Sequence, residues 1–181
     1  MAHDVNFDWS VWMPKEEATL LFVLDKSAER VLLIHKKRGL GAGKINGPGG
    51  RLEPGETPLQ AALRETREEV GVTAKNAAQC AKLSFHFTDG YDLLGHVFHA
   101  AEWEGEPVET DEALPEWFPF GAIPYGRMWA DDAFWFPLLL AGKTFEGKFV
   151  FDNDTMLSHE ITVKDGEPAN PGISRRLHCP T

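Results

Sequence analysis

Three glutamates stand close together in the first half of the chain. Glu65, Glu68 and Glu69 are related as i, i+3 and i+4, so a helix places them at neighbouring positions on one face. Like charges at this spacing repel one another, and a solvated acidic face is the ordinary interpretation of a Glu-rich helix. A divalent cation such as Mg²⁺ or Mn²⁺ would relieve the repulsion, because such ions prefer carboxylate and carbonyl oxygens. We therefore interpret the three glutamates as a metal site.

The residues around the glutamates favour this interpretation. Arg64 and Arg67 lie off the glutamate face and are expected to leave the carboxylates converging. The turn at residues 47–50 consists of glycine and proline, so a backbone carbonyl can approach the same point. Pro58 and Gly71 stand where helices tolerate proline and end on glycine, which predicts a helix between them. Its packing face is expected to contain Leu59, Ala62, Leu63, Thr66 and Val70.

Length and composition predict one soluble globular domain. The chain has 181 residues and a formal net charge of −10. Binding of a nucleic-acid polymer needs a broad basic surface, which this composition disfavours. The apolar runs are too short for a bilayer span and the N-terminus lacks a signal-peptide pattern, so we expect a cytoplasmic monomer. Cys80 and Cys179 imply no disulfide framework.

A basic stretch at residues 35–44 comes just before the glycine-rich turn. Together with a divalent cation it suits a small anionic ligand, and a solvated basic turn is the alternative interpretation. Lys44 is not followed by Ser or Thr, and no Gly-x-Gly-x-x-Gly opens a helix. A P-loop and a dinucleotide-binding loop are therefore both disfavoured.

Apolar periodicity and turn residues predict an α+β fold or an α/β/α sandwich. Residues 19–24 and 31–36 read as a hairpin, and a second helix is expected at residues 130–140. The other expected strands are residues 83–88, 91–101, 116–120, 148–151 and 156–163. We expect residues 18–163 to form the domain, residues 1–17 an N-terminal arm or extra strand, and residues 164–181 a C-terminal tail.

The stretch around the glutamates resembles the Nudix hydrolase signature. The matching positions are Gly50, Glu56, Arg64, Glu65, Glu68, Glu69, Gly71 and Val72, and Thr66 stands in a slot that is usually apolar. The resemblance implies an α/β/α sandwich with a mixed sheet and a loop-helix-loop Nudix box. It also implies pyrophosphate-bond hydrolysis with Mg²⁺, for which Mn²⁺ can substitute. The implied ligands are Glu65, Glu68, Glu69 and the Gly49 carbonyl, with Arg64 orienting a glutamate.

Residues 18–163 further resemble one branch of that family, the MutT-homologue-type oxidised purine nucleoside triphosphatases. The resemblance implies hydrolysis of 8-oxo-dGTP, and of 2-hydroxy-dATP as a further substrate, to the monophosphate and pyrophosphate, which sanitises the nucleotide pool. Glu112 maps onto an additional metal or catalytic carboxylate. Leu40, Pro48 and Leu93 depart from the residues common in this branch. The implied substrate-binding residues are Thr19, Lys36, Asn46, Pro48, Gly49, Gly50, Arg51, Phe85, Trp129, Asp131 and Asp132.

The chemistry of the segment around Trp129 fits a purine reader. An indole offers a stacking face. Two adjacent carboxyls cannot both ionise comfortably, so Asp131 and Asp132 together would supply a hydrogen-bond donor and an acceptor. The alternative is that the two aspartates cap a helix while Trp129, Phe134 and Trp135 pack in the core.

The sequence leaves three other interpretations. A zinc site at His96 and His99 is disfavoured, since residues three apart on a strand point to opposite faces. A Nudix hydrolase of another nucleoside diphosphate derivative, such as ADP-ribose, is the alternative enzyme. A non-catalytic nucleotide-sensing module on the same scaffold is the alternative outside enzymes, and the intact glutamates argue against it.

Overall fold

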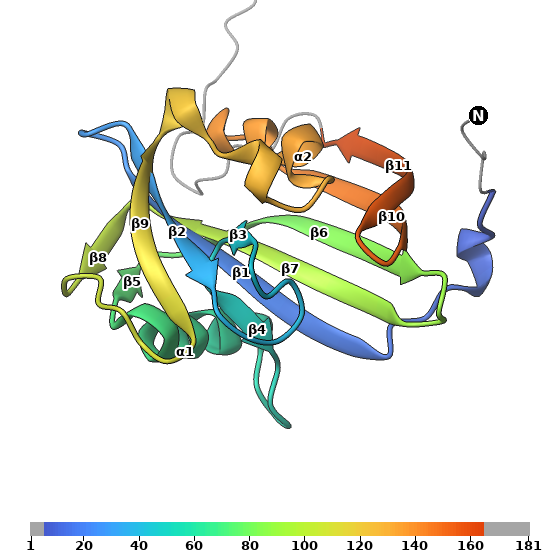
Figure 1. Cartoon of the computed structure of the whole chain (residues 1–181), viewed down its shortest axis with the longest axis horizontal. Coiled ribbons are helices and arrows are strands. Elements are labelled where there is room, and N and C mark those ends of the chain that lie inside the picture. The colour runs from blue at the N-terminus through green and yellow to red at the C-terminus, as the bar shows by residue number, and fades with distance from the viewer. Residues whose placement is uncertain (1–5, 165–181) are drawn as a thin grey trace, which may run out of the picture.

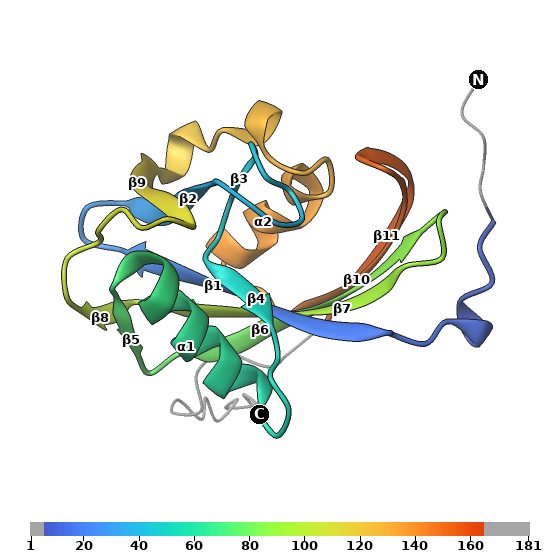
Figure 2. The same cartoon turned by 60° about the horizontal axis from the view of Figure 1, so that its bottom comes forward.

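The computed structural model describes residues 6–164, in which two α-helices cover opposite faces of a mixed β-sheet. Figures 1 and 2 show α1 (Pro58–Val70) on one side of the sheet and α2 (Asp132–Leu140) on the other. The predicted α/β/α sandwich is therefore confirmed. The tail expected at residues 164–181, with Cys179, lies outside the described range from residue 165 onward.

Within residues 6–164, nine strands form one sheet in the order β11-β10-β6-β7-β1-β2-β3, with β4 added to β1 and β9 added to β2. The pairs β1–β7 and β6–β10 are parallel and the other pairs of this sheet are antiparallel, so the sheet is mixed. Strands β5 and β8 form a separate ribbon. The strands are β1 (Glu16–Asp25), β2 (Arg30–Lys36), β3 (Ile45–Asn46), β4 (Gly49–Arg51), β5 (Thr73–Lys75), β6 (Ala78–Phe87), β7 (Asp92–Ala100), β8 (Glu102–Glu104), β9 (Ala113–Pro119), β10 (Phe145–Asp152) and β11 (Thr155–Val163).

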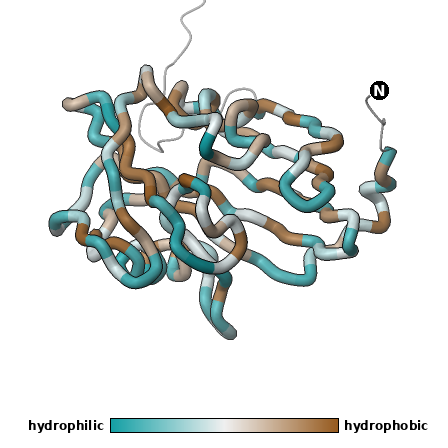
Figure 3. The backbone as a smooth tube through the Cα atoms, in the orientation of Figure 1, coloured by the Kyte–Doolittle hydropathy of each residue, from teal (hydrophilic) through white to brown (hydrophobic). Residues whose placement is uncertain are grey.

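Strand β1 is buried on both faces because a helix covers each of them. Leu21 and Val23 belong to the core beneath α1, whereas Phe22 and Leu24 belong to the core beneath α2. This explains why the strand reads as a continuous apolar run rather than an alternating one. Figure 3 shows the same pattern along the chain, with hydrophobic segments in the sheet and hydrophilic ones in many connecting loops.

Helix α1 has defined signals at both ends. Thr57 and Gln60 form a capping box, Pro58 occupies the first turn, and Gly71 ends the helix in the left-handed region at φ 73°. The packing face differs from the prediction at Leu59, which is 38% exposed, whereas Ala61 is buried. The buried stripe is rotated toward Ala61 and Glu69, which turns part of the carboxylate face toward β4.

Thr66, the departure in the Nudix signature, is fully buried, and its hydroxyl donates to the Ala62 carbonyl at 2.8 Å. The hydroxyl is therefore satisfied within the helix, and the residue packs like an apolar one.

Most of the predicted strands and both helices are confirmed, with shifted ends. The β1–β2 and β10–β11 hairpins form as expected. The short strands β3, β4, β5 and β8 were not predicted. Residues 6–15 form an arm with a 3-10 turn, η1 (Trp9–Val11), and β1 begins at Glu16, before the expected domain boundary. Two further 3-10 turns, η2 (Phe120–Ala122) and η3 (Tyr125–Arg127), precede α2. No helix in the part of the chain described has the length and hydropathy to cross a bilayer.

Phe22 should be a main determinant of stability. Its ring is fully buried, with centroids 4.9 Å from Phe136 and 5.9 Å from Trp135. Phe22→Ala is expected to lower the free energy of unfolding in urea by about 3–5 kcal/mol, because the cavity cannot collapse fully. The control Leu59→Ala, on the exposed side of α1, should change it by less than about 1 kcal/mol. If the two substitutions lower the free energy of unfolding by the same amount, Phe22 is not a main determinant of stability.

Candidate active site

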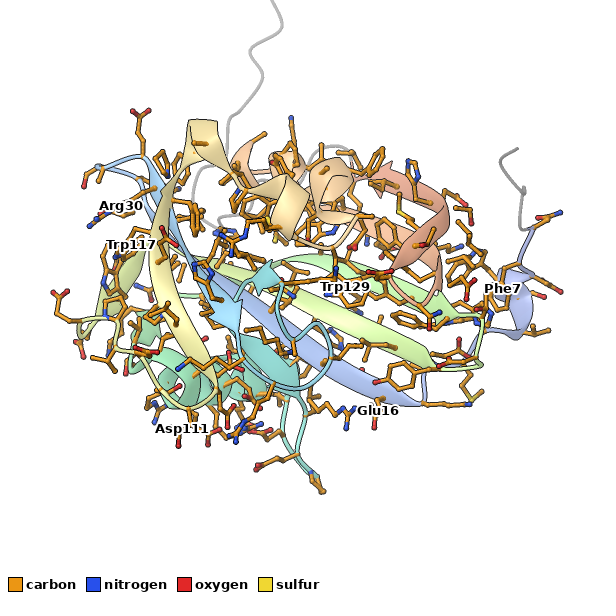
Figure 4. All side chains as sticks on the ribbon, viewed as in Figure 1. Phe7, Glu16, Arg30, Asp111, Trp117 and Trp129 are labelled. Atoms are coloured by element: carbon orange, nitrogen blue, oxygen red, sulfur yellow. The ribbon has the colours of Figure 1, made fainter. Side chains whose placement is uncertain are left out.

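A cavity of about 540 Å³ opens between β1, the glycine-rich loop, the β6–β7 hairpin and the start of α2. Its lining brings together residues that lie more than 100 positions apart in the chain. The predicted site residues that line it are Thr19, Lys36, Asn46, Gly49, Gly50, Arg51, Glu65, Glu69, Phe85, Glu112, Trp129, Asp131 and Asp132. Pro48, Arg64 and Glu68 are not among the residues lining the cavity. Figure 4 shows Trp129 in the central part of the molecule.

Three carboxylates converge at one end of this cavity. Glu65, Glu69 and Glu112 each place an oxygen within 4.8 Å of the others. Burial raises the pKa of Glu69 to about 7 and also raises the pKa of Glu65, and the neighbouring acids add to both effects. Converging, partly desolvated carboxylate oxygens fit a hard divalent cation, which would replace the protons that the cluster otherwise retains.

The glycines before α1 allow this cluster to lie against the backbone. A Cβ atom at Gly50 would lie 2.5 Å from the Glu65 carboxyl group, and one at Gly49 would collide with the Thr19 carbonyl. The Gly49 amide donates a hydrogen bond to Glu69 Oε2 at 3.2 Å. The expected close approach of the backbone is therefore present, whereas the role of the Gly49 carbonyl as a ligand stays a prediction.

Arg64 was expected to lie off the glutamate face and also to orient a glutamate, and its contacts agree with the second expectation rather than the first. Its long side chain reaches back over α1 and donates to Glu56 at 2.7 and 2.8 Å, to Glu65 at 2.9 Å and to Glu68 at 3.1 Å. The guanidinium lowers the pKa of Glu56 to about 2. Glu68 is 58% exposed and belongs to this arginine network rather than to the three converging carboxylates. Glu112 occupies the third position of the cluster.

Two buried aspartates stand at the other end of the cavity. Asp131 and Asp132 are 3% and 2% exposed. Asp131 Oδ2 accepts a hydrogen bond from Trp135 Nε1 at 2.7 Å, whereas Asp132 Oδ2 is buried without a partner among the described residues. Asp131 occupies the N-cap of α2, yet its side chain makes no capping hydrogen bond. The interpretation of the pair as simple helix caps is therefore wrong.

Desolvation makes ionisation of the aspartate pair unfavourable. It raises the pKa of Asp131 to about 6, and it raises the pKa of Asp132 well above its usual range, with the neighbouring Asp131 charge adding to the effect. One carboxyl of the pair therefore keeps a proton near neutral pH and can donate, while the other accepts.

Aromatic residues form the walls between the two ends. Trp129 packs edge-on against Phe151 at 5.5 Å, and Phe85 stacks on Phe149 at 5.3 Å. Sequence reasoning missed several lining residues, namely Phe87, Tyr91, Trp135 and Phe151. The alternating pattern of side chains in β6 could have predicted that Phe87 lines the cavity, because it places residues 85 and 87 on the same face of the strand.

The basic stretch is largely held in ion pairs at the rim. Lys37 contacts Glu109 at 2.7 Å, Arg38 pairs with Glu112, and Lys44 lies 5.2 Å from the centre of the Trp129 ring. Lys36 lines the cavity and its charge lowers the pKa of Glu69, which opposes the effect of burial. Two cations of the stretch therefore act on the glutamate cluster, Lys36 on Glu69 and Arg38 on Glu112.

His96, considered above as a zinc ligand, is buried and engaged elsewhere. Its Nε2 lies 2.9 Å from Glu17 Oε1, and its Nδ1 lies 3.0 Å from the Gln79 amide. Both ring nitrogens of His96 are therefore engaged in hydrogen bonds with other side chains.

Comparison with known proteins defines the class. The NUDIX domain matches residues 13–139, so the chain belongs to the Nudix family. It is 46% identical over 144 residues to the oxidized purine nucleoside triphosphate hydrolase of Danio rerio, covering 78% of this chain and 92% of the relative. Identity to the Mus musculus protein of the same name is 43% over 149 residues, covering 81% and 94%.

Solved structures agree with this family. The crystal structure of a MutT protein from Bacillus halodurans has a TM-score of 0.73 and 30% sequence identity, and the match covers 84% of this chain and 99% of that one. The Nudix fold implied by the sequence is therefore confirmed at the level of whole architecture.

The aspartate pair predicts a specific pH dependence of stability. Protonated Asp132 contributes to the free energy of unfolding. This contribution is fully present below the unfolded-state pKa of Asp132, near 3.8, and is lost as the pH rises through its higher folded-state pKa. Asp132→Asn removes this titration. In metal-free buffer, the stability of the variant relative to wild type should therefore increase as the pH rises from about 4 to 7.

Urea unfolding at several pH values measures this difference. Asp111→Asn, at an exposed position near the opposite end of the site, is the control and should follow the wild-type curve. If the free energies of unfolding of Asp132→Asn and wild type differ by the same amount at every pH, the raised pKa of Asp132 is contradicted.

Proposed function

We propose that this protein hydrolyses oxidised purine nucleoside triphosphates, with 8-oxo-dGTP as the main substrate and 2-hydroxy-dATP as a further one, to the monophosphate and pyrophosphate. The observation that carries the proposal is that one cavity contains a carboxylate cluster at one end and a buried aspartate pair at the other. The names of the Danio rerio and Mus musculus relatives support the same substrate class.

The carboxylate end suits the triphosphate. Glu65, Glu69 and Glu112 would hold Mg²⁺, or Mn²⁺ in its place, with Glu68 and the Gly49 carbonyl as the further predicted ligands. When bound, such an ion draws charge from phosphoryl oxygens and lowers the pKa of a coordinated water. A glutamate of the cluster would take the proton of the attacking water.

Two cations support the glutamates at this end. Lys36 would bind a phosphoryl oxygen, because it lines the same cavity and acts electrostatically on Glu69. Arg64 would keep Glu65 oriented through the hydrogen bond at 2.9 Å.

The aspartate end suits the base. An 8-oxopurine carries a hydrogen on N7 and a carbonyl at C8, so its altered edge offers a donor beside an acceptor. A carboxyl pair that shares one proton can accept from the first and donate to the second. Asn46 Oδ1 already accepts from the Gly47 amide at 2.8 Å, which leaves its amide NH₂ to donate to a base acceptor. Trp129 and Phe85 supply stacking faces.

The proposed substrate also fits the charge of the chain. A net charge of −10 disfavours contact with a nucleic-acid polymer, whereas the local cations around the cavity suit a free nucleotide. We accordingly infer that the enzyme acts as a monomer on the free nucleotide pool of the cytoplasm.

A substrate panel tests the proposal. With Mg²⁺, purified protein is expected to hydrolyse 8-oxo-dGTP with a kcat/KM at least about tenfold above that for dGTP, because about 1.5 kcal/mol is the lower end of the range for one hydrogen bond to a charged group. The panel should include 2-hydroxy-dATP and ADP-ribose, with pyrophosphate and monophosphate measured separately. Preferred cleavage of ADP-ribose, or equal rates on 8-oxo-dGTP and dGTP, would contradict the proposed substrate. Binding without turnover would indicate a nucleotide sensor.

The glutamate cluster predicts a large loss of turnover in Glu69→Gln. We expect kcat to fall by about 10²- to 10⁴-fold, because the substitution removes a buried carboxylate from the cluster. Glu104→Gln on β8, which is 72% exposed, is the control and should retain wild-type kcat. Near-normal Mg²⁺-dependent turnover of Glu69→Gln, with the Glu104→Gln control also normal, would rule out the proposed metal site.

A further inference from the structure

The N-terminal arm (residues 6–15) makes most of its specific contacts with the β6–β7 hairpin, and Lys148 of β10 lies 5.8 Å from the centre of the Trp9 ring. The Trp12 indole Nε1 donates to the Phe85 carbonyl at 3.2 Å, and the Phe7 ring stacks on His86 with centroids 3.8 Å apart and planes 14° apart. The Trp9 ring packs edge-on against Phe7 at 5.0 Å. Figures 1 and 4 show the arm, with Phe7 labelled, beside the end of this hairpin.

The last residue of the arm binds the hairpin turn. The Lys15 amide donates to the Asp92 carbonyl at 2.9 Å, and Lys15 Nζ donates to the Gly90 carbonyl at 2.7 Å. The pairing of β1 with β7 begins only at Glu16 and Leu93. Residues 88–92 therefore extend beyond the start of β1, and on this side Lys15 holds them through one backbone and one side-chain hydrogen bond.

The opposite side of the hairpin is held by the sheet. Strand β6 pairs with β10 as far as Phe87 and Phe151, and the Thr88 amide donates to the Phe151 carbonyl at 2.9 Å. The hairpin end is thus supported by a strand on one side and by the arm on the other. Loss of the arm would leave it supported on one side only.

This hairpin forms the base-side wall of the cavity. Phe85, Phe87, Tyr91 and Leu93 all line the cavity. The arm therefore contacts the outer side and the turn of the element whose inner side faces the ligand. A shift of the hairpin would move these side chains directly.

Glu16 connects this wall to the opposite one. The Tyr91 hydroxyl donates to the Glu16 carboxylate, and Arg51 Nε lies 2.8 Å from Glu16 Oε2. Tyr91 belongs to the hairpin, and Arg51 belongs to β4, where it directly follows the two glycines that pack against the glutamate cluster. Both residues line the cavity. One carboxylate thus ties the base-side wall to the phosphate-side loop. Figure 4 shows Glu16 at the start of β1, on the edge of the molecule.

We propose that the N-terminal arm and Glu16 form a positioning element that holds the β6–β7 hairpin against the nucleobase and thereby sets selectivity between modified and unmodified purines. The inference rests on the proposed function for its substrate. None of the arm residues lines the cavity, so they act through Phe85 and Tyr91 rather than on the nucleotide.

A purely stabilising arm would behave differently. Loss of a surface cover lowers the free energy of unfolding but leaves KM and selectivity unchanged, because the folded molecules keep the same wall. A positioning arm affects binding of the base while leaving the glutamate cluster intact. KM, kcat and Mg²⁺ dependence therefore separate the two roles.

The test uses the full chain with Phe7→Ala and with Trp12→Phe, which keeps a ring but removes the indole donor. For 8-oxo-dGTP we expect KM to rise about threefold to tenfold, the range of one lost hydrogen bond or stacking contact, with kcat within about twofold. The kcat/KM ratio of 8-oxo-dGTP to dGTP should fall by a similar factor. The Mg²⁺ concentration giving half-maximal rate should stay unchanged.

The matched control is Val11→Ala, because Val11 lies on the same arm and is 71% exposed. It should retain wild-type KM and selectivity. Unchanged KM and selectivity in folded Phe7→Ala and Trp12→Phe would overturn the proposal. An equal fall of kcat on 8-oxo-dGTP and dGTP, with KM constant, would overturn it as well.

Amide hydrogen exchange supplies a measurement that does not depend on the substrate. Without nucleotide, residues 85–93 should exchange faster in Phe7→Ala and Trp12→Phe than in wild type and Val11→Ala, while α1 exchanges at the wild-type rate. If wild type does not hydrolyse 8-oxo-dGTP, the proposed function fails and this measurement alone decides the role of the arm. Unchanged exchange of the hairpin would then overturn the arm's role.

Discussion

The structure of the site depends on close packing between two carboxylates of α1 and the two glycines of β4. Glu69 is buried and accepts from the Gly49 amide, while Glu65 occupies the space that a side chain at position 50 would need. This contact fixes the rotation of α1 and explains why its buried stripe includes a glutamate. Because β4 pairs with β1, the same contact ties the carboxylates to the centre of the sheet.

The cavity contains two groups of acids, the glutamate cluster and the aspartate pair, and the two groups have different neighbours. Glu65 and Glu112 have Arg64 and Arg38 as partners, and Lys36 acts on Glu69, so the cluster lies among cations and suits ionised ligands. Asp131 and Asp132 have an indole donor and no cation partner among the described side chains, and their burial is nearly complete. The three converging carboxylates offer the oxygen ligands that a divalent cation needs, whereas the aspartate pair lacks a third carboxylate and keeps a shared proton. The difference in surroundings, rather than the residue type, separates the phosphate end from the base end.

Local signals in the sequence predicted much of this fold. Contacts made by long side chains and by distant segments could not be predicted in this way. Pro58 and Gly71 were sufficient to define α1, because caps are encoded within a few residues. Strand β4 was not predicted, since its glycines lack β propensity and it forms through pairing with β1. The contacts of Arg64 likewise could not be derived from helical angles alone. Helical angles place its Cα off the glutamate face, but a long flexible side chain reaches Glu56, Glu65 and Glu68. Spacing alone could not add Glu112 to the glutamate cluster, because it comes from a loop far along the chain, and only the family resemblance pointed to it.

The two ends of the cavity rest on different supports, which has a consequence for how the protein works. The carboxylate end is built on α1 and β4, both packed against the centre of the sheet. The base end is built on α2 and on a hairpin whose turn extends beyond β1 and is held partly by the N-terminal arm. Side-chain contacts of Glu16 with Tyr91 and Arg51 join the hairpin to β4. Base recognition can therefore vary through the arm and the hairpin while the geometry of the glutamate cluster stays fixed. In the proposed function, the bond-breaking chemistry therefore depends on α1, β4 and Glu112, whereas the choice of purine depends on segments at both ends of the domain.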